Sequence, residues 1–244
     1  MSFWPGLIPR FVPSRLVCLA MRGLSALGGR IPERTRLDHL DENTSVIGRD
    51  GHLSGKSTDR HFIENQAELK RISFGASGRG LTDLSYSGCG AIAVWNAITA
   101  LGIKAPNGDV PDLPRIIYDF EKRYTVRRGR WGSVPTAAAS FFKRFPGLSV
   151  RVVYGKDAGR LQRLSDSSDV CIVTAFNDIN DIRKMVHTVC IEKRPEGFVI
   201  HNGYRNVSGR FVESDPYPVF ADAVRHIGGG SSVPIVTVGI KNLE

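Results

Sequence analysis

The strongest constraint on the fold is a change in the period of the apolar residues near position 147. Before it they recur at helical spacing, and Ile92, Trp95 and Ile98 share one face of a segment that stops at Gly102. After it they alternate or form short runs, as strands do. The expected helices cover residues 89–102, 111–124 and 133–145, with short ones at 159–164 and 219–227. The expected strands cover residues 148–154, 170–176, 186–193, 197–204 and 234–241. Helices followed by strands predict an α+β fold, with an antiparallel sheet packed on a helical lobe.

Cys89 lies in the segment best suited to chemistry. A turn of small residues, Ser87 and Gly88, leads directly into the apolar helical segment, which places the thiol in the first helical turn. Unpaired backbone N–H groups and the helix dipole at that position favour a thiolate, the form that attacks carbonyl carbon. The alternative is an unreactive small residue at a helix start.

His187 and Asn202 supply the partners that a nucleophilic cysteine needs. Two strands joined by a short turn at residues 194–197 would bring His187 close to Asn202. A cysteine needs a base, and the base needs an orienting group on its other ring nitrogen. A core histidine and an Asn-Gly turn are the alternatives. His201 precedes Asn202 and would point to the opposite face, at the surface or behind the residues that line the cleft.

Three segments together resemble the papain-like cysteine peptidases. They are Phe74-Gly75 with Tyr86-Ser-Gly-Cys-Gly-Ala-Ile-Ala-Val-Trp-Asn-Ala97, the strand His187-Thr-Val-Cys-Ile-Glu192, and Val199-Ile-His-Asn-Gly-Tyr204. The closest similarity is to the compact bacterial branch that includes the peptidase domains removing double-glycine leaders from bacteriocins. The resemblance covers residues 70–241 and implies a papain-like fold. It also implies Cys89 as nucleophile, His187 as general base and acid, and Asn202 as the residue that orients the imidazole.

One position departs from the family pattern. Papain-like enzymes carry a glutamine about six residues before the cysteine, and its amide helps to stabilise the oxyanion. In this chain Asp83 is the oxyanion candidate at that position, and an ionised carboxylate has no proton to donate. Four alternatives are open at this position. Asp83 is protonated, another donor takes its place, the alignment with the family pattern is shifted in this segment, or the site binds a peptide without cleaving it.

The resemblance implies a thiol hydrolase that cleaves a peptide or related amide, with a peptide or protein as substrate. An acyltransferase would use the same covalent chemistry, and a catalytically silent peptide-binding module would keep the fold. Ser87, Gly88, Trp131 and Tyr204 are candidates for the cleft lining. No cofactor is expected. A zinc site is not expected either, because His187 and Cys190 fall on opposite faces of one strand.

The formal net charge of +9 raises the question of a polyanionic partner. Four arginines (Arg123, Arg127, Arg128 and Arg130) precede Trp131, but no nucleic-acid motif accompanies them. A nucleic-acid partner is therefore not expected. The patch is either a solvated loop or a surface that attracts an acidic peptide.

Composition divides the chain into three parts. Residues 1–36 form a basic extension with a possible amphipathic helix at 14–27, either loosely ordered or in peripheral contact with a membrane. Residues 37–69 form a polar linker or pro-like segment with one short helix near 62–70, and residues 70–244 form the peptidase-like domain. Four scattered cysteines and no clear signal or membrane-spanning segment predict a cytoplasmic protein. The sequence does not indicate an oligomeric state.

Overall fold

The computed structural model describes residues 13–49, 61–76, 83–103, 111–178, 186–227 and 230–243. It confirms the α+β class with an antiparallel sheet. The sheet has five strands in the order β1-β7-β2-β3-β4, and every neighbouring pair is antiparallel. These strands are β1 (Leu148–Tyr154), β2 (Val170–Phe176), β3 (Val186–Arg194), β4 (Gly197–His201) and β7 (Val233–Asn242). A separate hairpin consists of β5 (Arg205–Val207) and β6 (Arg210–Val212).

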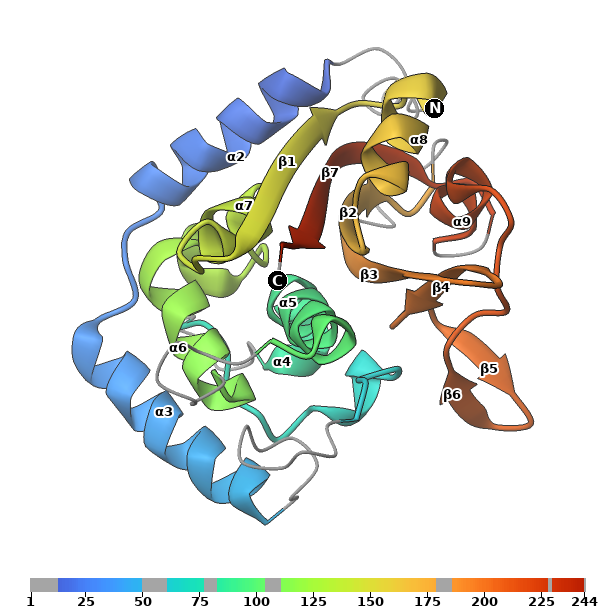
Figure 1. Ribbon diagram of the computed structural model, residues 1–244. Coiled ribbons are helices and arrows are strands. Elements are labelled where there is room, and N and C mark those ends of the chain that lie inside the picture. Colours follow the sequence, from blue (N-terminus) through green and yellow to red (C-terminus); the bar gives the residue numbers. More distant parts are fainter. Residues whose placement is uncertain are drawn as a thin grey trace, which may run out of the picture.

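Helices cover both faces of the sheet (Figure 1). On one face lie α5 (Cys89–Leu101), α6 (Leu113–Arg123) and α7 (Ala137–Phe142), and on the other lie α8 (Ala158–Asp166) and α9 (Phe220–His226). Even-numbered residues of β2, such as Ile172, join the core with α5, whereas odd-numbered ones, such as Val173, pack with α8 and α9. This alternation is the period of two that a strand requires.

Helix α5 is buried almost all round, and Trp95 is fully buried in its middle. The helix ends where the sequence predicts, at Gly102, which adopts a left-handed φ of 59° and closes the last turn. Because α5 packs on β3 and β2, its first residue, Cys89, lies against the sheet. The fold thus places the cysteine between the helical layer and the strands that carry the histidines.

Three expectations about helices are wrong. The short helix expected near residues 62–70 is only a 3-10 turn at Gln66–Glu68. Residues 33–48, assigned to a basic extension and a polar linker, form the helix α3 (Glu33–Gly48), which packs on α6 and buries few of its residues, among them Asn43 and Ile47. So polar a helix gives little apolar periodicity to detect. The helix expected at residues 133–145 is shorter, because Ser133 pairs with Thr125 in an isolated bridge and α7 begins only at Ala137.

Helix α2 (Ser14–Leu27) coincides with the amphipathic helix expected at residues 14–27. Its buried Cys18 packs with Phe176, Ile235 and Val236 at one end of the inner strands β2 and β7, so this part of the basic extension is docked. Among the described helices, none has the length and apolar character needed to cross a membrane.

Candidate functional site

A cavity of about 230 Å³ opens between the start of α5, the start of β3 and the turn before α7. The predicted residues that line it are Ser87, Cys89, Trp131, His187 and Tyr204. The predicted residues outside its lining are Asp83, Gly88 and Asn202. The fold therefore brings the predicted nucleophile and the predicted base to one cavity.

Gly88 fixes the position at which α5 begins. It ends the single turn α4 (Leu84–Ser87) and starts α5, since its N–H donates to Leu84 O and its carbonyl accepts from Ile92 N. A Cβ on Gly88 would come within 2.6 Å of the Leu84 carbonyl oxygen and would overlap the Leu84 side chain. Only glycine allows this approach, and the approach places the Cys89 thiol at the cavity.

His187 lies at the start of β3 with 3% of its surface exposed. Its Nε2 is 2.8 Å from the backbone oxygen of Asn202. Because a carbonyl only accepts, Nε2 carries the proton and Nδ1 keeps its lone pair. Burial lowers the pKa of His187 to about 4, so the imidazole is neutral near pH 7. The Tyr204 ring stacks on it at 4.6 Å between centroids.

Asn202 contacts the imidazole through its backbone and not through its side-chain amide. The amide is turned toward Gln66: Oδ1 accepts from Gln66 N at 3.1 Å, and Nδ2 donates to Gln66 Oε1 at 3.3 Å. The left-handed φ of 61° at Asn202 sends its carbonyl and its side chain to these separate partners. The prediction located the contact between His187 and Asn202 but named the wrong atom.

The expectation of a favoured Cys89 thiolate is wrong. Burial raises the pKa of Cys89 above its ordinary value, and this effect exceeds the lowering by hydrogen bonds from the Thr188 backbone and hydroxyl and from the first α5 backbone groups. Within the described residues, no hydrogen bond joins the Cys89 sulfur to His187. Thr188 faces α5 beside the sulfur, while His187 lies on the Tyr204 side of the cavity. The resting pair is therefore a neutral thiol and a neutral imidazole.

Asp83 has a structural position. Its Oδ1 accepts from Tyr86 N at 3.0 Å and from the Ser85 hydroxyl at 2.6 Å, which caps α4. Since Asp83 does not line the cavity, its carboxylate does not face the Cys89 thiol or the His187 imidazole there.

Gln66 is the site residue that sequence reasoning missed. It lies in the 3-10 turn η2 (Gln66–Glu68), is 3% exposed and lines the cavity. Its Nε2 donates to the carbonyl of Ser85 at 3.0 Å, which fixes the amide orientation because a carbonyl cannot donate. The second Nε2 proton has no partner in the described part of the chain. Gln66 lies far upstream of Cys89 in a polar segment, and no spacing in the sequence marks it.

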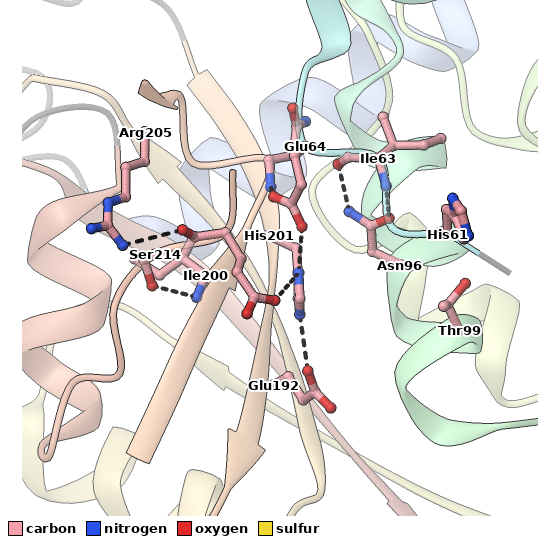
Figure 2. A network of polar contacts seen from close by, with 12 residues as sticks. His61, Ile63, Glu64, Asn96, Thr99, Glu192, Ile200, His201, Arg205 and Ser214 are labelled. Atoms are coloured by element: carbon pink, nitrogen blue, oxygen red, sulfur yellow. Dashed lines mark hydrogen bonds and ion pairs between the residues drawn. The ribbon is translucent and has the colours of Figure 1, made fainter. Parts of the chain in front are cut away.

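The segment that carries Gln66 is fixed to both halves of the fold (Figure 2). On the helical side, the backbone of Ile63 makes two hydrogen bonds with the Asn96 amide, at 2.8 and 3.0 Å. On the sheet side, Glu64 accepts from His201 Nδ1 at 2.6 Å and from Asn202 N at 2.8 Å. Glu64 thus holds the residue whose carbonyl orients His187.

His201 is fully buried behind Asn202. Of its two expected positions, at the surface or behind the cleft residues, the structure shows the second. Phe62 stacks on its ring at 3.8 Å, and its two nitrogens face Glu64 and Glu192. Burial lowers the pKa of His201, but the hydrogen bonds to the two carboxylates outweigh burial and hold the pKa above its ordinary value. Both nitrogens then carry protons, and His201 acts as a buried cation that joins two acidic side chains.

Glu64, His201 and Glu213 place one possible metal-ligand atom each within 4.8 Å of one another. These side chains already satisfy each other: His201 pairs with Glu64, and both oxygens of Glu213 accept from Arg194 at 2.8 Å. A metal ion there would have to break these bonds, so the cluster fits an ionic network better than a metal site.

Comparison with known proteins identifies no relative. No family model matches the sequence, and no curated protein or solved structure matches it. The papain-like resemblance is therefore carried by the motifs around Cys89, His187 and Asn202 alone.

Proposed function

We propose that the protein is a papain-like thiol hydrolase that cleaves a peptide or related amide. The observation that carries the proposal is that Cys89 and His187 line one cavity while Asn202 fixes the proton of His187 on Nε2. This tautomer leaves Nδ1 as a proton acceptor, which a general base requires.

The reaction would begin from the uncharged pair. The S–H proton passes to Nδ1 of His187 as the sulfur of Cys89 attacks the carbonyl carbon, and an oxyanion forms. The imidazolium then protonates the leaving amine as the C–N bond breaks. Water then attacks the thioester and gives a proton to Nδ1 of His187. The sulfur leaves and takes that proton back from the imidazolium. The pair has to approach when substrate binds, since catalytic hydrogen bonds often shorten only in the complex.

Gln66 would take the role that Asp83 cannot fill. Its second Nε2 proton and the backbone N–H groups of Cys89 and Gly90, which face the sulfur at rest, are donors for an oxyanion bound to Cys89. The bond from Gln66 to Ser85 O keeps that amide in place before substrate arrives, so no reorganisation is needed during the reaction.

The cavity mouth suggests how a peptide would lie. Trp131 and Tyr204 are 42% and 43% exposed although both are aromatic, and they line the cavity together with Arg130. The Arg127 guanidinium lies 4.8 Å above the Trp131 ring. Aromatic walls beside arginines suit a peptide with an apolar residue and nearby acidic ones.

A second candidate is the catalytically silent peptide-binding module. The raised pKa of Cys89 and the lowered pKa of His187 favour it, because neither group is charged at rest. An acyltransferase remains an alternative that differs only in the acceptor of the acyl group.

Peptidyl acyloxymethyl ketones separate enzyme from module, because they alkylate a cysteine that is activated in a substrate-like complex. A hydrolase is expected to be labelled at Cys89, with the labelling lost in Cys89→Ser and His187→Ala and kept in His226→Ala, which removes an exposed histidine. Labelling that does not depend on His187, or none from a panel of varied peptides, would favour the silent module. The products formed from a peptide ester with an added amine acceptor then distinguish the two reactions, since acyl transfer gives an amide and hydrolysis gives the free acid.

A further inference from the structure

A second and larger cavity, of about 920 Å³, lies away from Cys89. It is formed by α2, the turn at residues 28–32, the start of α3, the end of α6 and residues 134–140. Figure 1 shows α2, α3 and α6 around this region. Its size falls within the range of sites for small molecules.

The lining of this cavity is strongly basic. Its basic side chains are Arg22, Arg30, Arg36, Lys122 and Arg123, against the two acids Glu33 and Glu121. Arg22 is held in place because its Nε and Nη2 both lie within 3.2 Å of Thr136 Oγ1. Cations gathered in a concave, half-open cavity attract anions more strongly than the same charges on a flat surface.

Arg36 is the residue that points to a ligand. It is only 8% exposed, and its Nε is buried without a hydrogen-bond partner. In the described part of the chain its guanidinium makes no ion pair, and its Cζ lies over the Tyr118 ring, 5.6 Å from the centroid. A buried N–H without a partner is costly, so an anion that accepts from Arg36 would be bound favourably.

The start of α3 adds donors to the same cavity. Helix α3 has Pro32 before its first residue and no side-chain cap, and Pro32 and Glu33 line the cavity. The first N–H groups of this 16-residue helix therefore lie near the arginines. Such a helix start favours phosphate groups through its N–H donors and its dipole.

Glu121 indicates that the ligand is more than an anion. Its Oε1 accepts from His39 Nδ1 and from Gly75 N, each at 2.7 Å, and the bond with His39 raises the pKa of that imidazole. Its Oε2 is buried and has no partner. An acceptor of this kind needs a donor such as a hydroxyl group.

We propose that this cavity binds a small phosphorylated molecule that also carries hydroxyl groups, with Arg36 pairing with the phosphate and Glu121 accepting from a hydroxyl. The proposal is independent of the thiol chemistry, because none of these side chains lines the Cys89 cavity.

Calorimetric titration of the full chain at physiological ionic strength tests the proposal, with inorganic phosphate, ribose and ribose 5-phosphate as probes. We expect saturable binding of one ribose 5-phosphate, weaker binding of phosphate and none of ribose. Arg36→Met should weaken both phosphate probes by about tenfold or more, the loss of a charge-assisted hydrogen bond. Arg160→Met, which removes an exposed arginine on α8, should bind as the parent chain does.

Folding is monitored separately. Arg36→Met should unfold without ligand at the same or a higher temperature, because it removes a buried N–H that has no partner and keeps an unbranched side chain. Glu121→Gln should reduce the preference for ribose 5-phosphate over phosphate and leave phosphate binding unchanged. No saturable binding of either phosphate probe, equal binding by Arg36→Met, or equal affinity for the two probes would each overturn the proposal.

Discussion

Replacing Glu64 by alanine tests whether this carboxylate holds the site together. The change removes two acceptors at once: Oε1 from His201 Nδ1, at 2.6 Å, and Oε2 from Asn202 N, at 2.8 Å. His201 is fully buried, so its cation would lose one of two partners without access to bulk water. Asn202 would also be loosened, and with it the carbonyl that fixes His187.

The expected loss in the free energy of unfolding follows from these contacts. Hydrogen bonds to charged groups contribute about 1.5–3 kcal/mol each, and breaking a buried ion pair costs about 3–5 kcal/mol. Because the Glu64 side chain is 16% exposed, water reaches part of the vacated space, and we expect a loss of about 3 kcal/mol. Glu64→Gln should lose only about 1 kcal/mol, since its amide oxygen still accepts from Asn202 N and its NH₂ can donate to a neutral His201.

The loss of stability caused by Glu64→Ala should depend on pH. The pKa of His201 is raised above its ordinary 6.5, so its stabilising contribution is complete below pH 6.5 and is lost as pH rises through the folded-state pKa. The pKa of Glu192 is lowered below its ordinary 4.5, so its contribution is present above pH 4.5 and is lost as pH falls through its folded-state pKa. The difference between parent and Glu64→Ala should therefore be largest between pH 4.5 and 6.5. Urea unfolding across this range measures it, and a loss under about 1 kcal/mol would refute the reasoning.

Three further changes test the surroundings of Cys89. Thr188→Val removes a hydroxyl that lowers the Cys89 pKa, so iodoacetamide labelling followed by mass spectrometry should move to higher pH; an unchanged profile contradicts the contact. Gly88→Ala should cost about 1–3 kcal/mol in urea unfolding through overlap with Leu84, whereas Gly23→Ala, with open space in α2, should gain about 0.5–1 kcal/mol; equal effects would contradict the close approach. Gln66→Glu should slow hydrolysis of an activated peptide ester by about 10²–10³-fold, because a carboxylate cannot donate to an oxyanion, and full activity would exclude the role of Gln66.

Much of the fold could be predicted because its signals are local. The period of two in β2 and β3 and the apolar helix closed by Gly102 each follow from neighbouring residues. Helix α2 was visible for the same reason, while α3 was not, because a polar helix is stabilised by its contact with α6 and not by its own pattern. The start of α7 was misplaced because Ser133 pairs with Thr125.

The candidate site also combines features that the sequence predicts with features that only the tertiary structure shows. The sequence by itself determined that Cys89 starts a buried helix and that His187 and Asn202 meet across a hairpin, since both depend on spacing along the chain. Only the tertiary structure decided which atom of Asn202 contacts the imidazole and that Gln66 reaches the cavity. It also decided that burial keeps the Cys89 thiol protonated. Desolvation and long-range hydrogen bonds depend on which segments pack together, and no local pattern of residues encodes them.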